Sequence, residues 1–397
     1  MVETMNTALL GCQPSGNRKF TALAKAEPGC LFLTIGEPDF STPDPIKEAA
    51  KTALDQNLTH YPPNAGEPYL LERVSQFERE KNGVEYSPQE IIVTDGATEG
   101  LCLALGGILN PGDEVIVPIP AFGLYEPLVK LFRGEYIPMD TCGDGFQITA
   151  QNLARHITAK TKAILLNSPN NPTGAVYTPE SLEAVYQAAK EKNLFVLCDD
   201  VYAQLVYGPY QSFSRYQDIR GKIILIQSFS KPYAMTGWRM GYLCADRLII
   251  EQLAKLHSYM VVSAVSFLQK GCVAALDYDP SPMVEAYRRR RDYMYGRLTE
   301  MGMEVQKPQG AFYLFPSIQK YGMDSETFCV RMIKEAFPDK VMIGIWKVVT
   351  EGCDVYITPT MKEVEVLREI GSDIIPAGVK SVPREIELPP SLIKIGS

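Results

Sequence analysis

Residues 163–198 decide the fold, and they read AILLNSPNNPTGAVYTPESLEAVYQAAKEKNLFVLC. The stretch begins with one short apolar run and ends with another, as is typical of strands that are buried on both faces of a sheet. Between the runs, Thr178 followed by Pro179 is typical of a helix start, and Asn193 favours the left-handed conformation that ends a helix. A strand, a helix and a strand in this order predict a βαβ unit and therefore a parallel sheet.

Similar apolar runs occur before and after this unit. Short apolar or β-branched runs recur as candidate strands, at Ile91–Thr94, Glu114–Val117, Ala163–Leu166, Leu194–Cys198 and Ile223–Ile226. The sequence therefore predicts an α/β fold whose large domain, residues 46–280, is built on a mostly parallel, doubly wound sheet of the seven-stranded type. A smaller α+β domain is expected from both chain ends, with an N-terminal arm in residues 1–45, a C-terminal part in 281–375 and a tail in 376–397.

Beyond Pro282 the pattern of alternating short apolar runs and helices ends, and the elements predicted there belong to the smaller domain. A long polar helix carries four successive arginines, Arg288–Arg291, which we expect on a solvent-facing surface because the chain as a whole is acidic. A hairpin around Pro308–Gly310 is expected next, followed by a strand over Ala311–Phe315. The remaining expected elements are a helix after Ser325, a strand over Val355–Thr358 and a helix after Met361.

Composition excludes several classes of function. The chain has 397 residues, with 39 Lys and Arg against 47 Asp and Glu, and the net charge of −8 argues against a nucleic-acid partner or an anionic membrane surface. The nine cysteines form no C-x-x-C pair and the three histidines lack metal-ligand spacing, so neither a disulfide framework nor a metal site is expected. Because signal-peptide and membrane-spanning patterns are also missing, we expect a cytoplasmic protein with reduced thiols.

Polar residues follow the predicted strands, where parallel sheets collect their ligands. Small residues open a helix after the first strand, and the free backbone N–H groups of such a helix start favour an anion. The later strands are followed by asparagines, by carboxylates with a tyrosine, and by a lysine with two serines and an arginine. In chain order these groups are Asp95–Thr98, Asn167–Gly174, Asp199 to Tyr202, and Ser228–Lys231 with Arg239.

These residue types together suit one chemistry. A lysine amine forms a Schiff base with an aldehyde, and a carboxylate keeps a pyridine nitrogen protonated so that the ring withdraws electrons. An asparagine and a tyrosine donate to a phenolate oxygen, while hydroxyls, backbone N–H groups and an arginine hold a phosphate. The sequence therefore predicts a site for pyridoxal 5′-phosphate.

Four motifs carry a resemblance to a known family. They are I-G-E-P-D-F at Ile35–Phe40, His60-Tyr61 with Gly66, N-P-T-G at Asn171–Gly174, and S-F-S-K at Ser228–Lys231. From about Pro14 to Pro316 the chain resembles the fold-type-I pyridoxal-phosphate enzymes, specifically the class I/II aminotransferases. It is most similar to the branch that contains many bacterial and archaeal aspartate, alanine and aromatic aminotransferases. The resemblance implies a transferase that exchanges an amino group between an amino acid and a 2-oxo acid.

The resemblance also implies roles for the cofactor residues. Lys231 would be the Schiff-base lysine and proton shuttle, and Asp199 would pair with the pyridinium nitrogen. Asn171 and Tyr202 would bond the ring oxygen O3′, and Phe122 would stack on the ring. The phosphate would be held by Gly96, Ala97 through its backbone, Thr98, Ser228, Ser230 and Arg239.

Further implied roles concern the substrate and a second subunit. Tyr61 would reach the cofactor phosphate of the neighbouring subunit, which implies a homodimer with shared active sites. Gly36 would lie against the substrate with its backbone, and Asn171 would also contact the substrate. Tyr356 falls where the family usually has the arginine that clamps the substrate carboxylate, and no arginine occurs between Arg331 and Arg368.

Because of this departure, alternatives to a transaminase stay open at the level of sequence. The same cofactor site can serve a lyase, a cyclase or an oxidase that acts on an amino-acid-derived substrate. A binding or regulatory module that keeps the fold without catalysis is a third reading, although the lysine is present. A nucleotide-binding α/β enzyme is a fourth, and it lacks support because no glycine-rich fingerprint follows a strand. The sequence does not identify the substrate.

Overall fold

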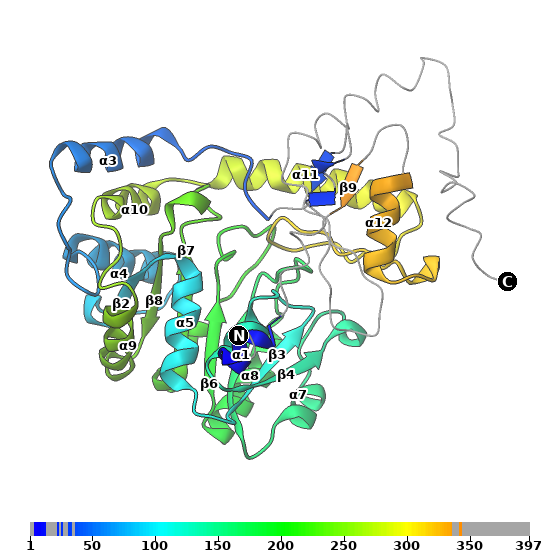
Figure 1. Cartoon of the computed structure of the whole chain (residues 1–397), viewed down its shortest axis with the longest axis horizontal. Helices are drawn as coiled ribbons and strands as arrows, with labels where there is room; N and C mark the ends of the chain where they lie inside the picture. The colour runs from blue at the N-terminus through cyan, green and yellow to red at the C-terminus, as the bar shows by residue number, and fades with distance from the viewer. Residues whose placement is uncertain are drawn as a thin grey trace.

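The computed structural model describes residues 4–12, 22–23, 25–26, 31–33, 36–335 and 341–343. Its centre is a seven-stranded sheet with the strand order β2-β8-β7-β6-β5-β3-β4 (Figure 1). The strands are β2 (Ile91–Thr94), β3 (Glu114–Ile119), β4 (Glu135–Asp140), β5 (Thr161–Asn167), β6 (Phe195–Asp199), β7 (Ile223–Ser228) and β8 (Gly241–Ala245). Only β8 runs against its neighbours, so the predicted mostly parallel, seven-stranded sheet is confirmed.

The five strands predicted for the large domain are all present in this sheet, and its two further strands, β4 and β8, were not predicted. β4 has no continuous apolar run because it lies at the edge of the sheet, with most of its residues exposed or half-buried and a proline at position 138. β8 reads GYLCA, so it begins with a glycine, contains no β-branched residue, and follows the polar loop that carries Arg239. Neither strand therefore shows the run of β-branched and other apolar residues by which the other strands of the sheet are recognised.

Helices cover both faces of the sheet, which is the doubly wound arrangement (Figure 1). Alternate residues of a strand enter different cores: Ile164 and Leu166 pack in one core, whereas Ala163 and Leu165 pack in the other. The helices before α11 are α1 (Thr7–Leu10), α3 (Asp44–Asp55), α4 (Pro68–Asn82), α5 (Gly96–Ile108), α6 (Tyr125–Leu131), α7 (Ala150–His156), α8 (Pro179–Lys192), α9 (Arg247–Met260) and α10 (Leu268–Asp277).

The helix predicted after Thr178 is confirmed as α8. The Thr178 side chain accepts a hydrogen bond from the backbone N–H of Ser181 at 3.3 Å, and Asn193 ends the helix with a φ of 55°. Short 3₁₀ helices connect other elements, at Pro88–Glu90, Cys142–Asp144, Phe213–Arg215, Gln217–Lys222, Thr236–Trp238 and Gln319–Tyr321.

The long polar helix is confirmed as α11 (Ser281–Glu300), but the expected exposure of its arginines is wrong for two of the four. Arg290 and Arg291 are only 7% and 8% exposed. Arg290 donates to both carboxylate oxygens of Asp39, at 2.7 and 3.0 Å, and Arg291 donates to the carbonyl of Pro308 at 2.9 Å. These two side chains therefore tie α11 to two different segments, one at Asp39 and one at Pro308, a role that a run of four arginines does not reveal.

The segment after α11 differs from the prediction. No continuous strand forms over Ala311–Phe315 in the described part of the chain; the backbone makes isolated antiparallel bridges, Val206 with Gly310 and Val305 with Pro316. The helix predicted after Ser325 is confirmed as α12 (Ser325–Glu335).

The two chain ends meet in a small second sheet. In it, β1 (Leu31–Leu33) pairs in parallel with β9 (Val341–Ile343). The elements predicted over Val355–Thr358 and after Met361, and the tail in 376–397, lie outside the described residues. The domain boundaries stay a prediction.

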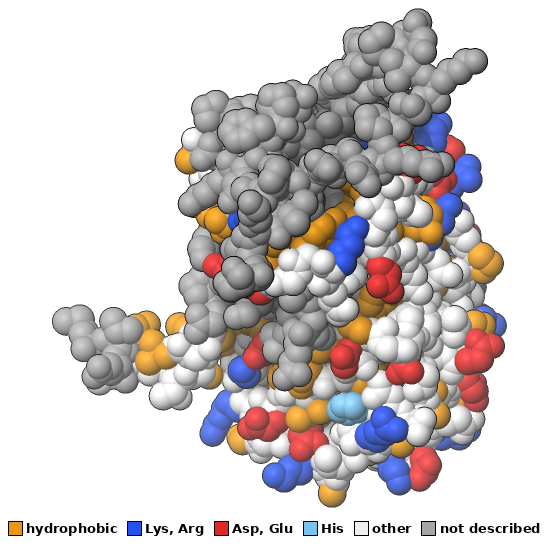
Figure 2. Space-filling view, turned by 90° about the vertical axis from the view of Figure 1, so that its right-hand side faces the viewer, with side chains coloured by type: hydrophobic (Ala, Val, Ile, Leu, Met, Phe, Trp, Pro, Cys, Tyr) orange, Lys and Arg blue, Asp and Glu red, His pale blue; other side chains and the backbone are white. Residues whose placement is uncertain are grey.

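The described surface carries charges of both signs. On the face shown in Figure 2, Lys and Arg side chains are interspersed with those of Asp and Glu over the lower part of the molecule. Among the described helices, none has the length and apolar character that crossing a membrane requires.

Candidate active site

The loop after β5 is fastened to the end of β6. Asn167 and Asp199, the last residues of these strands, lie side by side in register. The Asn167 side chain donates to the Asp199 carbonyl at 2.8 Å and accepts from the backbone N–H of Asn171 at 2.7 Å. Asn167 therefore aligns two predicted site residues, Asn171 and Asp199. Its place directly after an apolar run was the signal, but sequence reasoning gave it no role of its own.

Asp199 has one carboxylate oxygen paired and one unpaired. Its side chain is buried, with 3% exposure, and Oδ2 accepts a hydrogen bond from the Tyr125 hydroxyl at 2.7 Å. Oδ1 is buried without a hydrogen-bond partner among the described residues. Burial raises the pKa of Asp199 to about 6, against the opposing effect of the Tyr125 hydrogen bond. A buried carboxylate oxygen without a partner is costly, so this atom is suited to a ligand that brings an N–H or a positive charge.

Tyr125 was missed in the sequence. It lies three residues after Phe122, at the start of α6, and the two rings meet edge to face with centroids 5.7 Å apart. Its phenol belongs to the site only because the fold brings α6 against the end of β6.

Lys231 lies just beyond the end of β7, and its Nζ donates to the carbonyl of Gly36 at 2.6 Å. Burial lowers the pKa of Lys231 to about 8, and the charge of Arg239 acts in the same direction, while Glu37 and Asp199 oppose the shift. An amine with this pKa is neutral in a large fraction of molecules near pH 8, which makes it a nucleophile. The predicted residues Gly36 and Lys231 are thus brought together.

Gly96, Ala97 and Thr98 form the first turn of α5, as predicted for an anion site. A Cβ atom on Gly96 would lie 2.5 Å from Nη2 of Arg239, so the guanidinium group lies directly against this glycine. A Cβ atom on Gly241 would likewise lie 2.9 Å from the backbone nitrogen of Ala97. Glycine at both positions lets the helix start, β8 and the arginine approach one another. Helix N–H groups beside a guanidinium are the donor set that binds a phosphate.

The two serines of the S-F-S-K motif lie near this turn. The Ser228 hydroxyl accepts from the backbone N–H of Ser230 at 3.0 Å, and both residues are buried. Ser228 ends β7 and pairs with Gly241 of β8, the glycine that lies against Ala97. The hydroxyl therefore belongs to the same corner of the sheet as the helix start.

A buried histidine and a glutamate form hydrogen bonds next to the start of α5. Glu99 lies 2.7 Å from Nδ1 of His257 and accepts from the backbone N–H of Asp95 at 2.5 Å. Nε2 of His257 lies 2.9 Å from the carbonyl of Asn64. Each ring nitrogen of His257 thus faces an oxygen atom, and these two contacts fix the orientation of the ring. Neither residue stood out in the sequence.

Asn171 and Tyr202 are both buried. Burial raises the pKa of the Tyr202 phenol, and the side chains of Tyr313 and Asn171 act against that rise. The Tyr202 hydroxyl also hydrogen-bonds the hydroxyl of Tyr313, a residue that sequence reasoning placed in a strand without a role. Oδ1 of Asn171 is buried without a hydrogen-bond partner in the described chain. Since an amide can turn to exchange its O and N atoms, Asn171 is able to offer a donor to a ligand.

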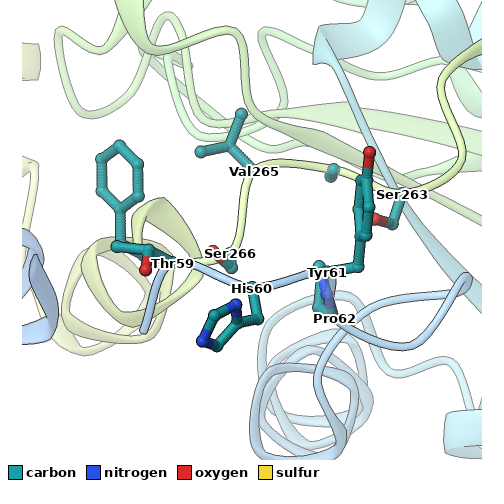
Figure 3. Close-up of a pocket in the computed structure, with 9 residues that line it drawn as sticks. Thr59, His60, Tyr61, Pro62, Ser263, Val265 and Ser266 are labelled. Carbon is teal, nitrogen blue, oxygen red and sulfur yellow. The ribbon is translucent and has the colours of Figure 1, made fainter. Parts of the chain in front are cut away.

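Tyr61 lies apart from this cluster of strand-end residues. Its side chain is 85% exposed and borders a pocket of about 410 Å³, where it lies beside Ser263 (Figure 3). The pocket is lined by Thr59, His60, Tyr61, Pro62, Ser263, Ala264, Val265, Ser266 and Phe267. Tyr356, the residue predicted at the position of the substrate-binding arginine, lies outside the described residues.

Comparison with known sequences agrees with this arrangement. The family model "Aminotransferase class I and II" matches residues 28–368. The chain is 40% identical to a probable N-acetyl-LL-diaminopimelate aminotransferase of Bacillus subtilis, over 85% of this chain and 86% of the relative. It is 39% identical to aromatic-amino-acid aminotransferase 2 of Thermococcus litoralis, over 81% of this chain and 85% of the relative.

Solved structures give the same result. A mutant aspartate aminotransferase of Thermus thermophilus superposes with a TM-score of 0.84 at 31% identity, covering 94% of this chain and 99% of the other. An aromatic aminotransferase of Pyrococcus horikoshii gives 0.81 at 35% identity, covering 89% and 99%. The chain therefore belongs to the class I and II aminotransferases, a family of transferases that use pyridoxal 5′-phosphate.

Proposed function

We propose that the cluster around Lys231, Asp199 and Arg239 is the active site at which this aminotransferase binds its cofactor and exchanges amino groups. The observation that carries the proposal is the buried, unpaired Oδ1 of Asp199, which lies in the same site as a lysine whose pKa is lowered to about 8. When bound, pyridoxal 5′-phosphate supplies an aldehyde that reacts with amines and a protonated pyridine ring that withdraws electrons. The donors and acceptors of the site match each part of that molecule.

Asp199 and Lys231 have the central roles in this proposal. Oδ1 of Asp199 accepts the N–H of the pyridinium ring, and the Tyr125 hydroxyl holds Oδ2 so that the carboxylate keeps its orientation. The Nζ of Lys231 is the amine that attaches the cofactor. With the cofactor and a substrate bound, the same Nζ would carry a proton between the substrate α-carbon and carbon C4′ of the cofactor, in one direction in the first half-reaction and in the opposite direction in the second.

The remaining predicted residues hold the cofactor. Asn171 and Tyr202 donate to its ring oxygen, and Phe122 packs on its ring. The phosphate is bound by Gly96, Ala97, Thr98, Ser228, Ser230 and Arg239, an assignment supported by the contact of Arg239 with Gly96 and of Gly241 with Ala97.

Replacing Lys231 with alanine tests this assignment. We expect the purified variant to lose both the visible absorbance of the bound cofactor and its turnover. Lys222→Ala is the matched control, because Lys222 directly precedes β7 whereas Lys231 follows its other end. A Lys231→Ala enzyme that kept the absorbance and the activity would refute the proposed site.

We propose an amino acid and a 2-oxo acid as the substrates. The relatives named above act on different amino acids, so they do not favour a single one. Gly36 and Asn171 are proposed to contact the substrate, and Tyr356 is the proposed neighbour of its carboxylate.

The test of the reaction type is a single half-reaction. Donor amino acid alone should convert the cofactor to its amine form and release one equivalent of 2-oxo acid. Release of oxo acid or ammonia while the cofactor remains an aldehyde would instead identify the lyase, cyclase or oxidase chemistry considered above.

We further propose that the chain forms a homodimer through the surface around the pocket of Figure 3. Large apolar side chains are exposed there to an unusual extent, Tyr61 at 85% and Tyr259 at 88%. Leu58, Met260, Val262 and Val265 add to the same exposed set. A second copy of the chain would bury this surface and bring Tyr61 to the cofactor phosphate of its partner.

The dimer is tested by light scattering after size-exclusion chromatography. Tyr259→Glu should give monomers with weakened cofactor affinity, whereas Leu248→Glu, an exposed apolar residue at the start of α9, should leave the dimer intact. A Tyr259→Glu protein that remained dimeric would argue against this surface.

A cytoplasmic location is also proposed. Four of the seven described cysteines, Cys198, Cys244, Cys272 and Cys329, are buried free thiols, which supports a reducing compartment. Cell fractionation with an antibody against the chain tests the location.

A further inference from the structure

Tyr202 and Tyr313 share a hydrogen bond in the interior of the protein. Their side chains are 3% and 2% exposed, and the two rings cross with centroids 5.4 Å apart at an angle of 78°. The hydroxyl groups bond each other directly. The nearby Asn171 side chain acts to lower the pKa of the Tyr202 phenol, as Tyr313 does, although burial raises that pKa overall. The phenol oxygen of Tyr202 therefore has polar neighbours from two distant segments of the chain.

The backbone around Tyr313 is fixed to the two loops that carry Tyr202 and Asn171. The N–H groups of Gln309 and Gly310 donate to the carbonyl of Gly174 at 2.8 and 3.0 Å. The N–H of Ala311 donates to the carbonyl of Leu205 at 2.7 Å. A Cβ atom on Gly310 would lie 2.4 Å from the ring of Pro169, so glycine allows this close approach.

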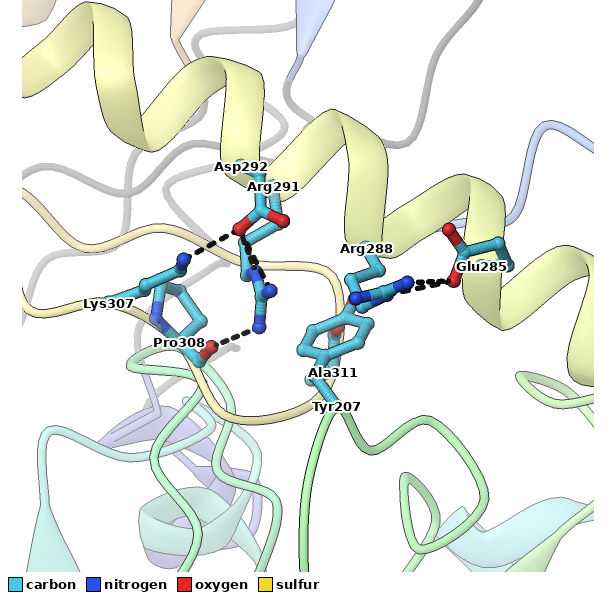
Figure 4. Close-up of polar contacts among 8 residues, drawn as sticks. All are labelled: Tyr207, Glu285, Arg288, Arg291, Asp292, Lys307, Pro308 and Ala311. Carbon is cyan, nitrogen blue, oxygen red and sulfur yellow. Dashed lines mark hydrogen bonds and ion pairs between the residues drawn. The ribbon is translucent and has the colours of Figure 1, made fainter.

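Helix α11 holds the same segment from its other side (Figure 4). Arg291 donates to the carbonyl of Pro308 at 2.9 Å, and its guanidinium group lies 4.3 Å from the ring centre of Tyr207. Tyr207 in turn donates its hydroxyl to the carbonyl of Ala311. Asp292 bridges Arg291 at 2.8 Å and Lys307 at 2.9 Å. The position of Tyr313 is therefore set by contacts on both sides of its loop.

We propose that Tyr313 is a positioning residue for Tyr202: it donates its phenol proton to the Tyr202 oxygen, so that the proton of Tyr202 is directed to the ring oxygen of the cofactor. Each phenol has a single proton, so Tyr202 can direct its own proton to the ring oxygen only when Tyr313 is the donor of the pair. The inference rests on the proposed role of Tyr202 at the cofactor.

This arrangement has a measurable consequence. A phenol that accepts a hydrogen bond donates more strongly, because hydrogen bonds in a chain polarise one another. Tyr313 therefore strengthens the bond by which Tyr202 stabilises negative charge on the ring oxygen. That stabilisation lowers the pKa at which the visible absorbance of the bound cofactor titrates, and loss of either hydroxyl raises this pKa.

The experiment is a pH titration of the visible spectrum of the purified holoenzyme. We expect Tyr202→Phe to raise the pKa at which the visible absorbance of the bound cofactor titrates by about one unit or more. This is the size expected for the loss of a hydrogen bond to a charged group. Tyr313→Phe, which keeps the buried ring, should raise it by about a third as much. In the double variant the shift should equal that of Tyr202→Phe alone, because Tyr313 acts through Tyr202.

Two further variants complete the test. Tyr86→Phe removes a buried phenol before β2, at the opposite end of the sheet, and should leave the spectrum unchanged. Tyr207→Phe removes the hydrogen bond to Ala311 and should give a shift in the same direction as Tyr313→Phe. A Tyr313→Phe spectrum that titrates like the wild type, while Tyr202→Phe is shifted, would overturn this inference alone. A Tyr202→Phe enzyme without any shift would instead overturn the proposed role of Tyr202.

Discussion

Replacing Asp199 with asparagine should stabilise the cofactor-free protein and destabilise the complex with the cofactor. Burial raises the pKa of this carboxyl from its ordinary value of 3.8 to about 6, a difference of about two units. At 1.36 kcal/mol for each unit, ionised Asp199 costs the cofactor-free protein about 3 kcal/mol of folding free energy at neutral pH. Asparagine has the same shape and cannot ionise, so the variant avoids this cost.

The sign of the effect with pH follows from proton binding. Because the folded carboxyl holds its proton more tightly than the unfolded one, the cost is absent below pH 3.8 and complete above about pH 6. Asparagine can still accept the Tyr125 hydroxyl, but its NH₂ group then takes the place of the unpaired Oδ1, which we expect to cost about 1 kcal/mol. The net gain for the cofactor-free variant is therefore about 2 kcal/mol at pH 7.5.

The assay is urea unfolding of both proteins, with and without the cofactor, at pH 5 and pH 7.5. Asp199→Asn should gain stability only in the cofactor-free form, and should bind the cofactor more weakly because the pyridinium nitrogen loses its anionic partner. Asp200→Asn is the matched control, since burial raises the pKa of that neighbouring carboxyl to about 7 while its partner is Ser212. It should stabilise the protein in both forms. A cofactor-free Asp199→Asn protein that is less stable than the wild type at pH 7.5 would refute the reasoning.

Three other predictions follow from the site. The rate of cofactor uptake by the cofactor-free enzyme should rise about tenfold per pH unit and level off above a pKa of about 8, because neutral Lys231 is the reactive form; a rate that still rises tenfold above pH 9 would contradict it. His257→Leu should cost about 3–5 kcal/mol in urea unfolding because it leaves Glu99 buried without its partner, whereas His156→Leu should cost much less. Tyr125→Phe should raise the pKa of Asp199 and weaken cofactor binding by about tenfold, measured by equilibrium dialysis, because it removes a hydrogen bond to a charged group; unchanged affinity would argue against the role of Tyr125.

Residues that directly follow an apolar run were predictable. Asp199 ends β6 and Lys231 lies just beyond the end of β7, so their position at one edge of the sheet was predictable because parallel strands place their carboxyl ends together. The helix after Thr178 was equally predictable, because Thr178 with Pro179 marks its start and Asn193 marks its end. In all these cases, the information lies within a few residues of the feature it predicts.

The partners of these residues were not predictable in the same way. Tyr125 meets Asp199 across 74 positions of the chain, and Tyr313 meets Tyr202 across 111. The Glu99–His257 contact spans 158 positions. Such pairs form only when helices and loops pack on the sheet, and no local pattern records that packing. For the same reason, Arg290 and Arg291 looked like exposed charges until their partners, Asp39 and Pro308, were placed.

The pairing of β1 with β9 bears on the order in which the chain becomes complete during synthesis. These strands come from opposite ends of the polypeptide, whereas all seven strands of the central sheet are made between residues 91 and 245. The central sheet, which carries Asp199 and precedes Lys231 at the end of β7, can thus assemble before the C-terminal part of the chain has been synthesised. Gly36 lies only a few residues after β1, and β1 cannot form its pairing until β9 has been synthesised. Because β1 can pair only after β9 has been made, the segment whose carbonyl accepts the Lys231 hydrogen bond is completed later than residues 91–245, which include the first turn of α5.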